Sequence, residues 1–291
     1  MAKARAIVKR RKAAGNIRKI TQTMQLVATA RYQKCYQRAV AAKPYTSRLT
    51  QMIETLAAVG SADHPLLRPN VGADRAIVLV ITSNRGLCGS YNSAVLRLAA
   101  ERRETLRKQG LNVQLEMVGK KGISYARFLN WALSERITDV EDKIAYARVA
   151  EMAQRYIDQY DTRQLARVEV VYTRFVSLGS QRPTAAALIP IEPPKSDKPK
   201  GGVRVDFEFS PPPGELLSRL IPETVKIGLY QCFNEGILSE QVARMVAMKA
   251  ATDAAGDMIK FLTRQYNRAR QGQITTELAD IVGGANAVEG K

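Results

Sequence analysis

Apolar residues near the start of the chain recur with the spacing of a helix. Four of them stand at intervals of three, four and three: Ile17, Ile20, Met24 and Val27. This spacing predicts a helix over about residues 4–56, with these side chains forming the face that packs against a second helix. Ala28 and Ala30 flank this face and would permit a close approach. Pro44 lies well inside the segment, and we expect it to kink or split the helix.

A longer pattern occupies the C-terminal third of the chain, from about residue 215 to 282. Eight residues alternate spacings of three and four without a slip: Met245, Met248, Thr252, Ala255, Ile259, Leu262, Tyr266 and Ala269. A mean spacing of 3.5 residues is typical of the seam of a left-handed coiled coil. Sixty helical residues would extend about 90 Å, too far for a helix inside one compact globule of this size. The N-terminal helix is the natural partner.

Between these helices, short apolar runs alternate with amphipathic segments. The runs predict strands over residues 75–83, 113–119, 167–176 and 185–191, and the segments predict helices over 90–108, 122–129 and 144–160. Strands separated by helices favour a mostly parallel sheet with both faces covered. The segment 192–202 is rich in Pro, Lys and Gly and is predicted to be a loop.

The patterns together predict a chain of class α/β that is divided into four parts. These are an N-terminal coiled-coil helix (residues 1–57), a central Rossmann-like α/β domain (74–192), a loop (193–213) and a C-terminal coiled-coil helix (214–287).

Composition excludes several kinds of protein. With 45% hydrophobic and 25% charged residues, the chain of 291 residues has ordinary globular character. It lacks the roughly 20 uninterrupted apolar residues of a membrane span, and its basic start lacks the apolar core of a secretory signal. The three cysteines form no C-x-x-C pair and His64 is the single histidine. This predicts no metal site, no disulfide framework and no histidine-based catalysis.

Charge is unevenly distributed along the chain. The net charge is +18, and 13 Lys or Arg residues precede Glu54, which is the first acid. Such a field attracts nucleic acid, anionic lipid or an acidic protein surface. A basic coiled-coil protein that binds nucleic acid is therefore an alternative, although the sequence offers no aromatic platform or recognised DNA-binding module.

A glycine-containing turn over residues 85–89 (RGLCG) follows a predicted strand and precedes a helix. Dinucleotide folds bind phosphate at such a position. The turn lacks G-x-G-x-x-G spacing, and the chain has no G-x-x-x-x-G-K-[ST] motif. We interpret it as a structural turn in which Cys88 is a small packed residue. A nucleotide-dependent enzyme is a third hypothesis, but no carboxylates are paired for acid–base work, so no catalytic or cofactor-binding residue is predicted.

Four groups of residues, in order along the whole chain, resemble the γ subunits of F-type ATP synthases. They are Ile20-Thr21…Met24…Val27-Ala28…Ala30-Arg31; Thr82-Ser83-Asn84-Arg85-Gly86-Leu87-Cys88-Gly89; Arg244-Met245…Ala247-Met248…Ala250-Ala251-Thr252-Asp253; and Tyr266-Asn267…Arg270-Gln271…Ile274-Thr275…Glu277…Ile281…Gly284-Ala285. The last group is the most specific. Three positions depart from the family: Arg11 replaces an apolar residue, Asn84 an Asp and Ala254 a frequent Asn.

The resemblance implies a non-catalytic central rotor of a proton-translocating synthase. Its terminal helices would form an antiparallel coiled coil inside a hexamer of alternating alpha and beta subunits. The α/β domain would touch the epsilon subunit and the membrane ring of c subunits. The rotor would couple ion flow through that ring to ATP synthesis or hydrolysis. We expect contact with the membrane only through the complex, on the cytoplasmic face of a bacterial plasma membrane, and no nucleic acid.

The resemblance also assigns contact residues. Met24 and Arg244 would meet the moving loops of the beta subunits. Four residues would make polar contacts further along the rotor: Arg270, Gln271, Thr275 and Glu277. The apolar tip seated in the head of the complex would consist of Leu278, Ile281 and Val282. The region around residues 206–215 is expected to contact the c ring or epsilon.

Overall fold

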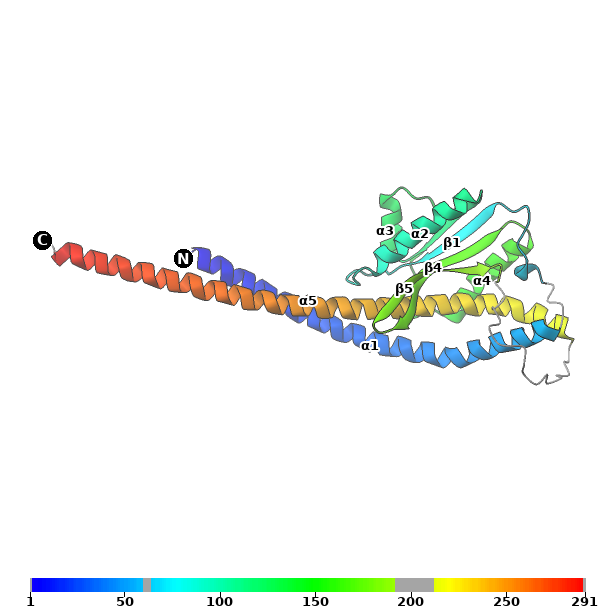
Figure 1. Cartoon of the computed structure of the whole chain (residues 1–291), viewed down its shortest axis with the longest axis horizontal. Coiled ribbons are helices and arrows are strands. Elements are labelled where there is room, and N and C mark those ends of the chain that lie inside the picture. Colours follow the sequence, from blue (N-terminus) through cyan, green and yellow to red (C-terminus); the bar gives the residue numbers. More distant parts are fainter. Residues whose placement is uncertain (1, 60–63, 192–211, 290–291) are drawn as a thin grey trace. The chain divides into compact units, whose positions relative to one another are not determined.

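The computed structural model describes residues 2–59, 64–191 and 212–289. It divides into two compact units, one made of residues 1–29 and 244–291 and the other of residues 30–243. Helices α1 (Ala2–Val59) and α5 (Pro213–Glu289) each contribute to both units (Figure 1). Both long helices are therefore confirmed. α1 continues through position 44, so of the two expected effects of Pro44, a kink or a split, the split is wrong. Most of the predicted loop 193–213 and of the predicted contact region 206–215 lies outside the described residues.

A five-stranded sheet forms the centre of the unit of residues 30–243. Its strands are β1 (Arg75–Ile81), β2 (Asn112–Val118), β3 (Leu133–Ile137), β4 (Arg167–Ser177) and β5 (Ser180–Ile189), in the order β3-β2-β1-β4-β5. The first four strands run parallel and β5 pairs antiparallel with β4, which confirms the mostly parallel sheet. β3 was not predicted, because this five-residue edge strand contains only two apolar residues.

Three helices connect the parallel strands, and a turn of 3-10 helix, η1 (Pro65–Leu67), precedes β1. They are α2 (Tyr91–Lys108), α3 (Lys120–Phe128) and α4 (Tyr146–Asp161), each within two residues of a predicted boundary. Alternate residues of β1 face opposite ways. Ala76, Val78 and Val80 pack towards α2 and α3, whereas Ile77, Leu79 and Ile81 pack towards α4 and the first part of α5. The sheet is thus covered on both faces, as a parallel sheet requires.

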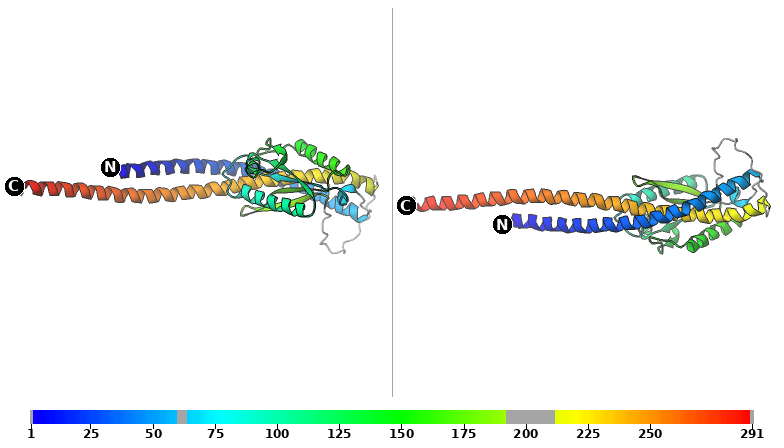
Figure 2. Two further views of the ribbon diagram at one scale, coloured as in Figure 1. Left: turned by 90° about the horizontal axis from the view of Figure 1, so that it is seen from above. Right: turned by 90° about the horizontal axis from the view of Figure 1, so that it is seen from below.

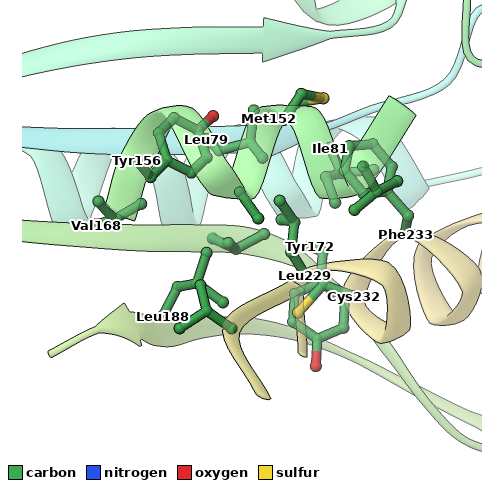
Figure 3. Close-up of a cluster of buried hydrophobic side chains, with 14 of the residues drawn as sticks. Leu79, Ile81, Met152, Tyr156, Val168, Tyr172, Leu188, Leu229, Cys232 and Phe233 are labelled. Carbon is green, nitrogen blue, oxygen red and sulfur yellow. The ribbon is translucent and has the colours of Figure 1, made fainter. Parts of the chain in front are cut away.

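The larger core lies between the sheet, α4 and α5 (Figure 3). The strands contribute Leu79, Ile81, Val168, Tyr172 and Leu188; α4 contributes Met152 and Tyr156; and α5 contributes Leu229, Cys232 and Phe233. Because α5 supplies side chains to this core, the start of the C-terminal helix is part of the folded body of this unit.

Two buried carboxylates fix helices to opposite faces of the sheet. Glu169 of β4 accepts two hydrogen bonds from the guanidinium of Arg102 on α2, at 2.9 and 2.7 Å. Glu116 of β2 accepts from Arg155 at 2.8 Å and from the hydroxyl of Tyr156, both on α4. Burial raises the pKa of Glu116 above its ordinary value, and the interactions with Tyr156 and Arg155 offset only part of this increase. Because these charged hydrogen bonds are directional, they help to fix the positions of α2 and α4 on the sheet, which apolar packing alone does not specify.

The chain enters and leaves the α/β part of this unit at one place. Since β5 runs opposite to β4, it brings the chain back to the edge where β1 begins. There the backbone N–H of Ile191, just after β5, donates to the carbonyl of Leu66 in η1, the turn of helix that precedes β1, at 2.8 Å. The sheet and helices α2 to α4 therefore lie between two adjoining segments.

In the other unit, residues 2–29 of α1 run alongside α5 in the opposite direction, and the last turns of α5 extend beyond the start of α1 (Figure 2). The hydroxyls of Thr21 and Thr252 hydrogen bond at 2.8 Å. Ten residues earlier on α1, the guanidinium of Arg11 lies 5.5 Å from the ring centroid of Tyr266, which is later on α5. Arg11 thus packs by a cation–π contact where the family usually has an apolar side chain.

The predicted seam of α5 is confirmed. All eight of its residues, from Met245 to Ala269, are buried or half-buried, with Met248, Ala255 and Leu262 the most enclosed. A spacing of seven between these three residues is the repeat of a coiled coil.

The predicted seam of α1 is wrong. Ile17, Ile20 and Val27 are exposed, Ile20 to 59%, and Met24 is only half-buried. The buried positions are instead Ala14, Thr21 and Ala28, which also stand seven residues apart. These small side chains leave room for the larger residues of α5. The size of a residue, and not its apolar character alone, therefore decides which positions of α1 lie in the seam.

Enlarging a seam residue of α1 should weaken the fold. We expect Ala28→Leu to cost about 1–3 kcal/mol of unfolding free energy, because the added atoms have no room in a position that is 1% exposed. Ala30→Leu, two residues along the same helix and exposed, should change stability by less than about 0.5 kcal/mol. Urea unfolding followed by circular dichroism measures both. Equal costs would contradict the seam.

The three thiols should be unreactive in the folded chain. Cys35, Cys88 and Cys232 are all buried, and burial raises the pKa of Cys232 to about 12. At pH 8 Cys232 is therefore a thiol and not the reactive thiolate. We expect almost no reaction with a chromogenic disulfide reagent in native buffer, and three reactive thiols in guanidinium chloride. A thiol that reacts rapidly in the native chain would contradict this arrangement.

Candidate interaction surface of the paired helices

The unit of paired helices exposes many large apolar side chains. They are Val8, Ile17, Ile20, Leu26 and Val27 on α1, and Val246, Met258, Phe261, Ile274, Leu278, Ile281 and Val282 on α5. Isolated exposed apolar residues are common, but a set this dense on two paired helices is typical of a surface that a partner covers. We define this set as the outer apolar surface.

The nine single residues predicted as contacts, from Met24 to Val282, all lie in this unit. Arg270, Gln271, Thr275 and Glu277 are exposed on α5, whereas Arg244 is only 7% exposed. The Thr275 hydroxyl donates to the carbonyl of Gln271 at 3.0 Å, and Glu277 accepts from Gln273 at 2.8 Å. Arg270 and Gln271 thus present their side chains outward, while Arg244 is enclosed within its own chain.

The three residues predicted as an apolar tip lie where α5 has no neighbouring helix. Figures 1 and 2 show α5 continuing beyond the start of α1. Arg11 lies beside Tyr266 in this antiparallel pair, so residue 2 of α1 falls opposite about residue 275 of α5, and Leu278, Ile281 and Val282 follow that point. All three are exposed, Ile281 to 68%. These side chains therefore contact little of their own chain and are available to another molecule.

Positive charge accompanies the outer apolar surface. Residues 2–29 contain eight Lys or Arg and no acid, while residues 244–289 contain six Lys or Arg and five acids. Since residues 2–29 of α1 contain no acid to neutralise these cations, the exposed side of this stretch favours an acidic partner surface.

The Thr82–Gly89 motif, in contrast, is engaged in internal hydrogen bonds. Asn92 of α2 accepts from the backbone N–H of Ser83 at 3.0 Å and donates to the Ser83 hydroxyl at 2.8 Å and to the Cys88 sulfur at 3.3 Å. Thr82 donates to the carbonyl of Val118 at 2.6 Å and accepts from Gly122 N–H. These bonds explain the motif structurally, in agreement with the interpretation of residues 85–89 as a turn.

A glycine is required where β2 passes into α3. Gly119 has a φ of +93°, and a Cβ there would lie 2.4 Å from the carbonyl oxygen of Thr82. The motif after β1 and the turn after β2 therefore lie in close contact through their backbones.

Two further observations limit the kinds of site. Among the described residues, no cluster of three or more His, Cys, Asp or Glu side chains could hold a metal ion. Within the same ranges, no helix combines the length and the apolar character needed to cross a membrane.

Sequence reasoning missed several residues of the outer apolar surface, including Leu26, Met258 and Phe261. The signal was present, since these residues lie off the seven-residue frame of Ala14, Thr21 and Ala28 or of Met248, Ala255 and Leu262. An apolar residue outside the seam of a two-helix coiled coil has no position in the core of that pair. The prediction for α1 was based on its largest apolar residues, so it did not identify the buried positions Ala14, Thr21 and Ala28.

Comparisons with known proteins cover the whole chain. Residues 3–288 match the sequence model of a protein family whose description is "ATP synthase". The ATP synthase gamma chain of Rhodopirellula baltica is 44% identical over 296 residues, covering 100% of both chains. The ATP synthase gamma chain of Frankia casuarinae is 41% identical and covers 93% of each.

Solved structures share the fold at lower sequence identity. A chain of the Euglena gracilis mitochondrial ATP synthase (OSCP, F1 and c-ring, rotational state 3) has a TM-score of 0.64 at 17% identity, covering 99% of this chain and 95% of that one. A chain of the Tetrahymena thermophila mitochondrial ATP synthase central stalk and c-ring has a TM-score of 0.58 at 20% identity, covering 80% and 99%.

These matches agree with the four motif groups, and no comparison supports the nucleic-acid-binding alternative. Paired terminal helices, a mostly parallel sheet and full-length similarity lead to one assignment: the chain belongs to the ATP synthase gamma chain family.

Proposed function

We propose that this chain is the central rotor subunit of an F-type ATP synthase. It carries no catalytic site and turns within a hexamer of alpha and beta subunits. Its rotation couples ion flow through a c ring to ATP synthesis or hydrolysis in that hexamer. The epsilon subunit and the c ring are the further partners.

One observation supports the proposal above the others. The paired helices keep a dense outer apolar surface exposed, in a chain that is 44% identical along its whole length to an ATP synthase gamma chain. Leaving such a surface in water is unfavourable, by roughly 25 cal/mol per Å² of apolar area. A subunit that is enclosed by others in its complex removes that cost.

The mechanism follows from asymmetry. The two helices present different side chains on each side, so a surrounding ring of equivalent subunits meets a different surface at each position. Each orientation of the rotor then favours a different conformation of the neighbouring nucleotide sites, although the rotor contributes no residue to them. Rotation changes these preferences in turn.

The contact residues have distinct proposed roles. Met24 and Arg244 lie near the moving loops of the beta subunits. The half-buried state of Met24 leaves part of its side chain available, whereas Arg244, 7% exposed, presents little of its own side chain. The exposed polar residues Arg270, Gln271, Thr275 and Glu277 form hydrogen bonds further along. Leu278, Ile281 and Val282 form an apolar bearing, in which non-directional packing permits turning.

Charge and location complete the proposal. The acid-free residues 2–29 face acidic loops of the surrounding subunits, which attract the rotor without fixing its angle. The complex lies on the cytoplasmic face of a bacterial plasma membrane, and this chain reaches the membrane only through its partners.

Observation of rotation tests the proposal directly. Val71 is 92% exposed and belongs to the unit of residues 30–243, so Val71→Cys provides one reactive thiol beside three buried ones. The variant is assembled with alpha and beta subunits that are fixed to a surface, and a bead is attached at residue 71. We expect the bead to turn in one direction when ATP is added. Hydrolysis of ATP without rotation would reject the rotor assignment.

A charge introduced at Met24 should disturb coupling more than assembly. We expect Met24→Lys to retain the complex but to reduce ATP-driven proton uptake relative to hydrolysis, because a cation is added beside the existing ones. Gln22→Lys, which adds the same charge at an exposed position two residues earlier, should have a smaller effect. Proton uptake and hydrolysis are measured in the same membrane vesicles, and equal coupling in Met24→Lys and wild type would count against the placement of Met24.

A further inference from the structure

One residue of the loop between β3 and α4 contacts both long helices within the unit of residues 30–243. The Asp142 carboxylate forms an ion pair with Arg31 of α1, with 2.7 Å between Oδ2 and Nη1. Its other oxygen, Oδ1, accepts from the side-chain amide of Gln241 on α5 at 3.1 Å. The Asp142 carbonyl accepts from Arg38 at 3.1 Å and from the Cys35 thiol at 3.8 Å.

These donors lie along one face of α1. Arg31, Cys35 and Arg38 are separated by four and three residues, which places them in a row over two turns. Gln241 is almost completely buried on α5. Asp142 therefore contacts residues on two successive turns of α1 and one buried residue of α5.

The loop that presents Asp142 is itself held to the sheet. Asn84, after the carboxyl end of β1, donates to the carbonyls of Thr138 and Val140 at 3.2 and 2.6 Å and accepts from the backbone N–H of Lys120 at 3.0 Å. Val140 and Ile144, on either side of Asp142, are buried in the core. An ionised aspartate at position 84 could accept but not donate, so asparagine fits this loop.

We propose that Asp142 is a positioning residue that joins the sheet to α1 and α5, so that sheet and helices turn together. The inference rests on the proposed rotor function. A rotor transmits torque only if the part that receives it cannot slide along the part that delivers it. Apolar packing opposes separation but is non-directional, whereas hydrogen bonds and ion pairs fix position along a helix.

A simpler reading is an ordinary surface ion pair, since Arg31 and Asp142 are both partly exposed. Exposed pairs contribute little to stability. Asp142 differs from such a pair because it accepts hydrogen bonds from both α1 and α5 and because its loop is held to the sheet by Asn84. Asp139, three residues earlier in the same loop, is a matched control, because its ion pair, at 3.5 Å, is with Arg148 of α4 and not with a long helix.

The test compares complexes that contain wild type, Asp142→Ala, Asp142→Asn or Asp139→Ala. ATP hydrolysis and ATP-driven proton uptake are measured in the same membrane vesicles. We expect Asp142→Ala to hydrolyse ATP at the wild-type rate but to lose proton uptake. Asp142→Asn, which still accepts from Gln241 but has no charge for Arg31, should be intermediate, and Asp139→Ala should match wild type. Wild-type coupling in Asp142→Ala, or an equal loss in Asp139→Ala, would overturn the proposal.

Hydrogen exchange on the isolated full-length chain gives a second measurement that does not depend on assembly. We expect the backbone amides of residues 31–39 to exchange roughly tenfold faster in Asp142→Ala, with the amides of β1 unchanged. Unchanged exchange at residues 31–39 would overturn the proposed joint even if coupling fell. Failure of the wild-type chain to assemble with alpha and beta subunits would instead reject the rotor function, while exchange would still report on the joint.

Discussion

The close approach of two helices from opposite ends of the chain is the constraint on which this structure depends. Ala14, Thr21 and Ala28 stand seven residues apart on α1 and face a matching repeat on α5. Because the seam of α1 uses small residues, its larger apolar residues are left on the outside. One choice of residue size therefore produces both a stable pair of helices and an outer apolar surface that favours partners.

The same separation of roles explains what could be predicted. The buried repeat of α5 could be predicted because it contains large apolar residues such as Met248 and Leu262. On α1 the large residues mark the outer surface, so Ile17 and Ile20 were assigned to the wrong face. A periodic apolar pattern identifies a helical face, but it cannot say whether that face meets the same chain or another one.

Within the α/β part, burial on both faces gave β1 and β4 their continuous apolar runs, and these were found from the sequence. β3 was missed because an edge strand has few apolar positions. The hydrogen bonds of Asn84, Asn92 and Asp142 could not be predicted either, since they join residues that become neighbours only in the folded chain. Thr82 was identified as a motif residue, but its internal hydrogen bonds required the structure, and so did the requirement for glycine at position 119.

The antiparallel β5 has a consequence for how such a chain could arise. Its direction returns the backbone to Leu66, so the sheet and its covering helices begin and end at adjoining points. A domain whose ends adjoin can be inserted into a connection between two other elements without separating them. The α/β part can thus be understood as an insertion into a helical hairpin, and a short linker between residues 66 and 191 would bridge the position it occupies.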